Sequence, residues 1–307
     1  MKQLLYAPLG WLIHLLALLP LPALYCMADV VYFFMYHVTG YRRKVVEKNI
    51  RDSFPDKDDE WHRRTVKKFY LNLADYFMET IKLLHISDDE MSRRMEFEGL
   101  EDVDRLLGSG RSVLAYFAHC GNWEWVPSIT LHCRAMSDPK VRFCQVYRPL
   151  RNQWFDAMML KLRSRFGSYS IRKNGVLREM LTMRRDGIAS ITGFMSDQKP
   201  SHGDDVTILE FMHHPTAMIT GTATLARRLG MAVVYFDMQK PSRGHYRLTV
   251  RHITDDASTW DADELTRTYA SLLEETINRN PAIWLWSHKR WKKPVTLPSE
   301  KPNPDKK

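Results

Sequence analysis

The sequence predicts an α/β protein, with a mostly parallel or mixed central sheet flanked by helices and an apolar N-terminal helix in front of it. From residue 112 onward, short β-rich runs alternate with helical stretches, which is typical of a sheet covered by helices. Residues 4–38 are almost wholly apolar, and a membrane-spanning helix needs about 20 such residues. We therefore expect a membrane anchor over residues 1–40 and one folded domain over residues 41–307.

The composition narrows the class of protein. The chain has 307 residues, of which 44% are hydrophobic and 26% are charged, so it is neither a disordered chain nor a fibre. Its mean hydropathy of −0.39 excludes a polytopic transporter but allows one anchor. The four cysteines are scattered without a CxxC pair, so we expect reduced thiols and no zinc framework.

The apolar N-terminal run carries features that oppose a straight spanning helix. Pro20 and Pro22 interrupt it near the middle, and Asp29 costs about 3 kcal/mol at a helix centre on insertion scales. We expect one tilted, kinked transmembrane helix. Two shorter helices in the interface and a buried helical hairpin are the alternatives. A cleavable signal peptide is disfavoured, because only Lys2 precedes the run and no clear cleavage site follows it.

Positive charge follows the anchor directly. The net charge is +9, and the anchor is followed by Tyr41-Arg42-Arg43-Lys44. Basic residues flanking an anchor predict a body on the cytoplasmic side, against an anionic membrane surface. Nucleic acid is not an expected partner, because no RNA- or DNA-binding signature is present.

The elements of the body follow from periodicity and capping residues. Apolar residues at three- and four-residue spacing predict a helix over residues 58–85, and Ser87-x-x-Glu90 is a capping box for the next one. Strands are predicted at 112–119, 141–148, 169–172, 187–197, 206–211, 231–238 and 245–253. Helices are predicted at 123–136, 150–166, 174–185, 217–229 and 261–279, the last with Asp261 as N-cap. The Lys/Pro-rich tail after residue 292 is expected to fray.

The most informative local pattern is His119-x4-Glu124 at a strand-to-helix corner. An apolar strand ends at His119, Gly121 permits a sharp turn, and Glu124 begins the next helix. Ligands bind at such carboxyl ends of strands in open α/β sheets. A carboxylate on one imidazole nitrogen raises the basicity of the other, so we expect Glu124 to orient His119 as a general base. With no serine partner, the hydroxyl must come from the substrate, which predicts a transferase.

Other interpretations of this corner stay open. His119 can be a satisfied strand-end histidine, with Glu124 stabilised by the helix dipole. A thiol nucleophile at Cys120 is disfavoured, because neighbouring strand residues point to opposite faces. A zinc site using His119, His132 and Cys133 lacks a suitable spacing, so we expect no metal.

Several motifs occur in one order along nearly the whole chain. They are Arg43…Asn49-Ile50…Phe54-Pro55, His119-x4-Glu124, Tyr147-Arg148-Pro149, Arg172-Lys173-Asn174, Asp197-Gln198, Thr220-Gly221-Thr222 through Gly230, and Trp286-Ser-His288-Lys-Arg290-Trp-Lys. With them the chain resembles the bacterial lipid A late acyltransferases of the lauroyl and myristoyl type, within the glycerolipid acyltransferase superfamily. A Phe-Pro-Glu-Gly-Thr element, expected of relatives that acylate glycerol phosphates, is missing.

The resemblance implies a reaction at the inner membrane, on its cytoplasmic side. A fatty acyl chain would pass from the phosphopantetheine thioester of acyl carrier protein to a hydroxyl of a lipid A precursor, without a cofactor. His119 would take the hydroxyl proton and Glu124 would hold His119. Backbone N–H groups of residues 121–124, or the Arg148 guanidinium, are the candidate donors to the oxyanion.

The remaining candidate residues would bind substrate. Arg148 is a candidate for a lipid phosphate, and Asp197 and Gln198, which end a strand, are candidates for sugar hydroxyls or for orienting Arg148. Arg172 belongs to a basic cluster with Arg163, Arg165 and Lys173. This cluster is a candidate for contact with lipid phosphates or the acidic carrier protein, and a solvated surface is the alternative. Asn122 and Trp123 are candidate contacts, with Trp123 as a wall of an acyl groove.

Two rival functions remain. The first applies the same chemistry to another membrane lipid, such as an aminolipid, a glycolipid or a pigment alcohol. The second is a non-catalytic module that binds anionic lipid. The tryptophans and basic residues of 284–291 suit either a membrane-interface belt or core packing.

Overall fold

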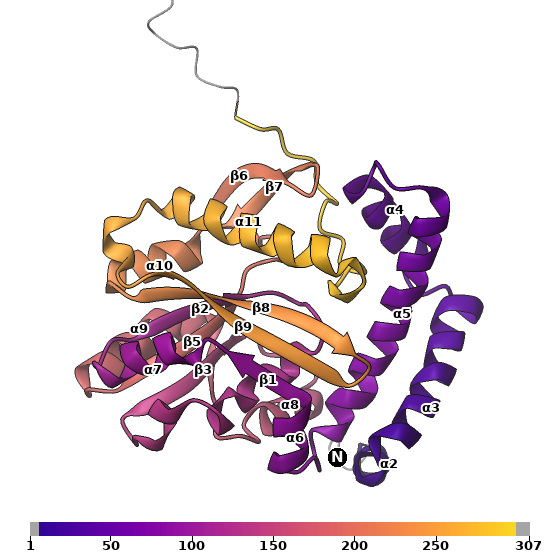
Figure 1. Ribbon diagram of the computed structural model, residues 1–307, viewed down its shortest axis with the longest axis horizontal. Helices are drawn as coiled ribbons and strands as arrows, with labels where there is room; N and C mark the ends of the chain where they lie inside the picture. The colour runs from indigo at the N-terminus through magenta and orange to yellow at the C-terminus, as the bar shows by residue number, and fades with distance from the viewer. Residues whose placement is uncertain (1–5, 299–307) are drawn as a thin grey trace, which may run out of the picture.

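The computed structural model, described for residues 6–298, is built around a seven-stranded sheet (Figure 1). The strands lie in the order β1-β9-β8-β2-β5-β3-β4. Neighbouring strands are parallel except for the antiparallel pair β8 and β9, so the predicted α/β class with a mostly parallel sheet is confirmed. The strands are β1 (Met95–Glu98), β2 (Val113–Phe117), β3 (Val141–Tyr147), β4 (Tyr169–Arg172), β5 (Ala189–Met195), β8 (Ala232–Ser242) and β9 (His245–Thr254).

Helices cover both faces of this sheet. Figure 1 shows α10 (Gly221–Leu229) and α11 (Ala262–Arg279) above it, and α7 (Leu100–Gly108) and α9 (Val176–Arg185) below it. The central strand β2 is buried along its whole length, because it lies between two strands and two helical layers. The side chain of Asp261 accepts hydrogen bonds from the first turn of α11, which confirms the predicted N-cap.

A β-hairpin of β6 (Val206–Phe211) and β7 (His214–Ile219) stands apart from the main sheet. The second strand was not predicted, and it includes residues 217–219 that were expected to be helical. The turn places Met212 and His213 at φ 51° and 61°, the backbone of a tight two-residue hairpin. Neither position is the Gly or Asn that normally marks such a turn, so no local signal predicts this hairpin. The short edge strand β1 was also missed.

The corner after β2 is a 3₁₀ helix, not the α-helix predicted over 123–136. The segment η2 (Trp123–Leu131) contains Pro127, which has no N–H to donate, so a regular α-helix is disfavoured there. Shorter 3₁₀ turns are η3 (Arg134–Ser137), η4 (Lys173–Gly175), η5 (Ala257–Thr259) and η6 (Pro281–Ile283). Two α-helices complete this part of the chain, α6 (Asp88–Arg94) and α8 (Gln153–Arg163). The Ser87 hydroxyl accepts from the Glu90 N–H, as the capping box predicts.

The N-terminal region forms a helical flank beside the sheet (Figure 1). Its elements are α2 (Ala7–Leu18), α3 (Leu21–Phe33), the π-helical turn η1 (Phe34–Val38), α4 (Arg43–Ser53) and α5 (Asp59–Lys82). The helix predicted over 58–85 is confirmed as α5, which begins at an Asp58 cap on the Trp61 N–H. Leu21, Leu24 and Ala28 of α3 are buried against α5.

The apolar run is broken where the prolines predicted a break. Leu19 and Pro20 adopt extended backbone between α2 and α3, so the run forms two helices in place of the single kinked one that we expected. Among the described residues, Leu21–Val38 is long and apolar enough to cross a membrane, whereas α2 is shorter. The first residues of the run and the end of the basic tail, 1–5 and 299–307, lie outside the described residues.

Candidate active site

Strand register brings His119 and Asp197 together. Phe117, the last residue of β2, lies opposite Met195, the last residue of the parallel neighbour β5. His119 and Asp197 each follow two residues later. Because parallel strands end at the same edge of a sheet, both side chains emerge side by side at the carboxyl edge.

Asp197 holds His119 through two contacts. Its Oδ1 lies 2.8 Å from the imidazole Nδ1, and its Oδ2 accepts from the His119 backbone N–H at 3.1 Å. Oδ2 also accepts from the Trp284 indole N–H at 2.9 Å. The carboxylate is 2% exposed. Burial raises the pKa of Asp197, but the His119 ring and these donors outweigh it, so the pKa lies below its ordinary 3.8. An ionised Asp197 therefore fixes the ring.

The other imidazole nitrogen contacts Gln198. The Gln198 Nε2 lies 3.2 Å from the His119 Nε2, and the His119 side chain is 16% exposed. Because an amide NH₂ can only donate, His119 Nε2 is the acceptor in this arrangement and Nδ1 carries the proton given to Asp197. An imidazole held in this tautomer is suited to accept a proton at Nε2. Trp123 meets the ring edge-on, and Tyr76 stacks on Trp123 at 4.2 Å.

The predicted contact between Glu124 and His119 is wrong. Glu124 is buried and forms a bidentate ion pair with Arg163, at the end of α8, with distances of 2.7 and 2.8 Å. Both ring nitrogens of His119 already have partners from the segment after β5. A buried carboxylate needs a counter-charge, and the forked Arg163 guanidinium supplies it.

The sharp turn at Gly121 is confirmed, and it removes one predicted oxyanion donor. Gly121 has φ 58°, and a Cβ there would lie 2.9 Å from the Tyr246 ring. Its N–H donates to the Ile283 carbonyl at 2.9 Å, so it is not free for a ligand. Asn122, predicted to bind substrate, is fully buried and donates to the Glu79 carboxylate at 3.0 Å. That amide holds the corner onto α5, away from solvent.

Arg148 and Arg172 share the carboxyl edge with His119 but lie farther along it. Arg148 follows β3 and Arg172 ends β4, which are the second and third strands from β2. At about 4.8 Å per strand, they stand roughly 10 and 14 Å from the His119 strand. Both side chains are exposed, and Arg172 donates to the Tyr147 hydroxyl at 3.4 Å. Asp197 was a candidate for orienting Arg148, but the hydrogen bonds and ion pairs of the described residues include none between the two side chains.

The segment 284–290 belongs to the core, not to a membrane-interface belt. Trp284, Trp286 and Arg290 are buried. His288 accepts from the Lys199 N–H at 3.1 Å, and burial lowers its pKa to about 4. Cys120 is also buried, and burial with the nearby Asp197 and Asp237 raises the pKa of its thiol well above the ordinary value, so the thiol stays protonated.

Sequence reasoning missed three of these relationships. Asp197 was predicted as a substrate ligand, although its position two residues after a strand matches that of His119 and is a usable signal for pairing. Arg163 was placed in a surface cluster, and no local pattern connects it to Glu124. Trp284 was expected in a membrane-interface belt or in the core, and its contact with Asp197 arises only through the tertiary fold.

Comparison with known proteins identifies relatives over most of the chain. The sequence model of the bacterial lipid A biosynthesis acyltransferases matches residues 4–293. The chain is 24% identical to the lipid A biosynthesis lauroyltransferase of Escherichia coli K12 over 95% of this chain and 94% of the relative. It is also 24% identical to the palmitoleoyltransferase of the same organism, over 82% and 79%. An acyltransferase of Haemophilus influenzae is 21% identical over 81% and 76%.

Proposed function

We propose that this chain, which belongs to the bacterial lipid A biosynthesis acyltransferase family and is an acyltransferase, moves a fatty acyl chain from a carrier-protein thioester to a hydroxyl of a lipid A precursor. The observation that carries the proposal is the 2.8 Å contact between His119 Nδ1 and Asp197 Oδ1, in a His119 side chain that is 16% exposed. Asp197 takes the orienting role that the sequence suggested for Glu124.

The proposed reaction begins when the acceptor hydroxyl replaces the Gln198 amide as donor to His119 Nε2. That nitrogen accepts the hydroxyl proton while the oxygen forms a bond to the thioester carbonyl carbon. Asp197 stabilises the resulting imidazolium. The tetrahedral intermediate then expels the thiolate, which takes the proton from Nε2, so the products are an ester and a free thiol. A proton transfer and a thiol leaving group suffice, and the scheme uses no metal and no resident cofactor.

Support for the acceptor and donor comes from charge and from the relatives. The relatives are named for lipid A biosynthesis, and two for transfer of lauroyl and palmitoleoyl chains. Positive charge lies at the same carboxyl edge of the sheet as His119, on Arg148, Arg172 and Lys173. This charge suits the phosphates of a glycolipid or the acidic surface of acyl carrier protein. Lys173 also pairs with Asp204 at 3.0 Å.

The proposed location is the inner membrane, with the body on the cytoplasmic side. The exposed apolar N-terminal helices and the basic Arg42-Arg43-Lys44 that follow them support it. Acyl carrier protein is a cytoplasmic donor, so a cytoplasmic site is also the arrangement that the chemistry needs.

A transfer assay with separated lipids tests this function. Purified full-length protein is incubated with acyl carrier protein that bears a radiolabelled acyl chain. Separate reactions contain a lipid A precursor, an aminolipid, a glycolipid or a pigment alcohol as the acceptor. We expect label in the lipid A precursor alone, and loss of at least about 10² in rate for His119→Ala, the scale of a general base. A folded His119→Ala variant with the wild-type rate would overturn the mechanism. Label in another lipid alone would refute the assignment of a lipid A precursor as the acceptor.

A further inference from the structure

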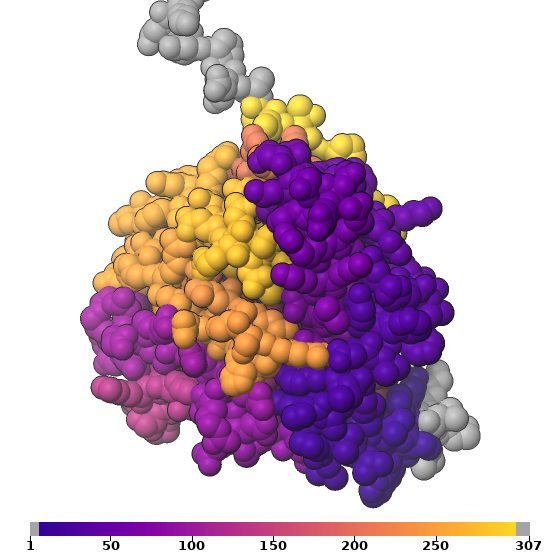
Figure 2. Space-filling view, turned by 45° about the vertical axis from the view of Figure 1, so that its right-hand side comes forward, coloured from indigo at the N-terminus to yellow at the C-terminus, as the bar shows by residue number. Residues whose placement is uncertain are grey.

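The two N-terminal helices present an apolar face to solvent. Trp11 is 79% exposed, and the other large apolar side chains of this face are between 37% and 62% exposed. They are Leu9, Leu12, Leu15 and Leu18 of α2, and Val30, Phe33, Phe34 and Val38 of α3 and η1. Figure 2 shows the N-terminal helices, in indigo, as a continuous flank of the molecule. An apolar surface of this kind marks an interaction site.

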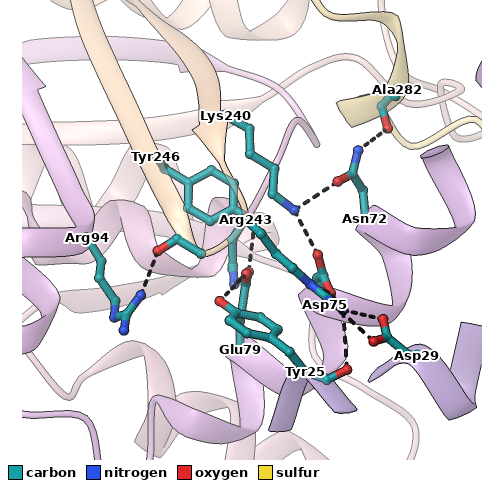
Figure 3. Close-up of polar contacts among 12 residues, drawn as sticks. Tyr25, Asp29, Asn72, Asp75, Glu79, Arg94, Lys240, Arg243, Tyr246 and Ala282 are labelled. Atoms are coloured by element: carbon teal, nitrogen blue, oxygen red, sulfur yellow. Dashed lines mark hydrogen bonds and ion pairs between the residues drawn. The ribbon is translucent and has the colours of Figure 1, made fainter. Parts of the chain in front are cut away.

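The border of α3, between its buried side and its exposed apolar face, is fastened to the body by charged and polar contacts (Figure 3). Asp29 pairs with Arg243, in the β8–β9 turn, at 2.6 Å, and Arg243 also pairs with the buried Asp75 of α5 at 2.7 Å. The Tyr25 hydroxyl donates to the buried Glu79 at 3.1 Å. These contacts join α3 to both α5 and the sheet.

The junction between α2 and α3 is held as well. The Lys82 ammonium, at the end of α5, donates to the Leu19 carbonyl at 2.9 Å and to the Ala17 carbonyl at 3.3 Å. These carbonyls lie at the C-terminal end of α2, where a cation is favoured by the helix dipole. The bend between the two apolar helices is therefore part of the folded body.

Crossing a bilayer would require α3 to leave this body. At 1.5 Å per residue, α2 is about 18 Å long and Leu21–Val38 about 27 Å, against a hydrocarbon core of about 30 Å. Asp29 lies at the centre of Leu21–Val38, so spanning would break its pair with Arg243 and place the carboxylate at mid-membrane. Glu79 would lose the Tyr25 hydroxyl at the same time.

We propose that α2 and α3 lie in the plane of one leaflet of an anionic bilayer, with their apolar face sunk to the level of the upper acyl chains, and that neither crosses the membrane. Charge at the end of this face favours an anionic lipid as the occupant. Arg42, Arg43 and Lys44 line a shallow hollow of about 550 Å³ with Gly40, Val45 and Glu47, and it begins two residues after Val38. Glu47 pairs with Arg43 at 2.7 Å, and the hollow keeps a net positive charge from Arg42 and Lys44. This inference rests on the proposed function, because a protein bound in this way lies on the leaflet that contains its acceptor lipid.

Depth measurements by spin-label EPR test this binding mode. The labels are placed on full-length protein at the native, exposed Cys26 and, in a Cys26→Ser background, at Leu15→Cys, Val30→Cys and Val38→Cys, on phosphatidylethanolamine vesicles with one quarter phosphatidylglycerol. We expect similar shallow depths at all four sites, about 5–10 Å below the phosphates. A label at residue 30 near the bilayer centre with residue 38 back at a surface would overturn the proposal in favour of a span. Water-exposed labels at all four sites would overturn it in favour of no membrane contact.

A matched pair of variants supplies the second measurement. Trp11→Ser with Leu15→Ser removes two exposed apolar side chains, and we expect vesicle affinity to fall at least about tenfold. Leu181→Ser, on an exposed position of α9 outside the N-terminal helices, should leave the affinity unchanged. Equal affinity of all three proteins would contradict the proposal. Neither readout uses acyl transfer, so an inactive protein with the expected depths would refute the proposed function alone.

Discussion

Glu124 binds Arg163 through two parallel hydrogen bonds, while the neighbouring His119 is held by Asp197 from a different strand. The two carboxylates at this corner therefore have separate partners. Glu124 neutralises the Arg163 guanidinium, and Asp197 holds the His119 imidazole.

Asp197→Asn should lower kcat by about 10² or more while leaving the fold intact. The amide has the same shape as the carboxylate, but it cannot stabilise a protonated His119, and it permits the wrong imidazole tautomer. The rate is measured with the carrier-protein thioester, and folding by circular dichroism. A near wild-type rate in a folded variant would show that His119 does not depend on this carboxylate.

Glu124→Gln should act mainly on stability. It leaves the largely buried Arg163 without its counter-charge, and breaking a buried pair from one side costs about 3 kcal/mol in the free energy of unfolding. The double variant Glu124→Gln with Arg163→Met should recover much of that loss in urea titrations. If Glu124→Gln abolishes transfer without changing the urea midpoint, Glu124 acts in the chemistry after all.

Gly121→Ala should destabilise the protein by about 2 kcal/mol or more. The position has φ 58°, and the added Cβ would lie 2.9 Å from the Tyr246 ring, so both the backbone and the packing are strained. Gly108→Ala is the control, because a Cβ there meets nothing within 4 Å, and it should be neutral or slightly stabilising. Thermal unfolding compares the two. Equal melting temperatures would contradict the close approach.

His288 should make unfolding depend on pH between about 4 and 6.5. Its pKa falls from an ordinary 6.5 to about 4 on folding, so the unfolded chain binds the extra proton in this range. Stability contributed by the neutral ring is therefore present above pH 6.5 and is lost as the pH falls toward 4, by at most about 1.4 kcal/mol per pH unit. His288→Gln should flatten this part of the curve. Parallel curves for the two proteins would refute the assignment.

Local signals predicted most elements of the fold. The strand runs of β2, β3 and β5 and the caps at Ser87 and Asp261 depend on residues close in sequence, so they could be predicted without the structure. The errors fall where distant contacts decide. The β6–β7 hairpin closes through a turn without Gly, and η2 stays a 3₁₀ helix around Pro127.

In the candidate site, residues close together in the chain account for the imidazole at the end of β2, the tight turn at Gly121 and the apolar helices before the body. The identity of the carboxylate that meets His119 depends on contacts between segments far apart in the chain. Only four residues separate His119 from Glu124, so a contact between them was plausible from the sequence. The register of β2 on β5 instead places Asp197 against the His119 ring. Glu124 is buried and pairs with Arg163. Charge pairing between elements far apart in the chain likewise fastened Asp29 to Arg243, which no local pattern predicts.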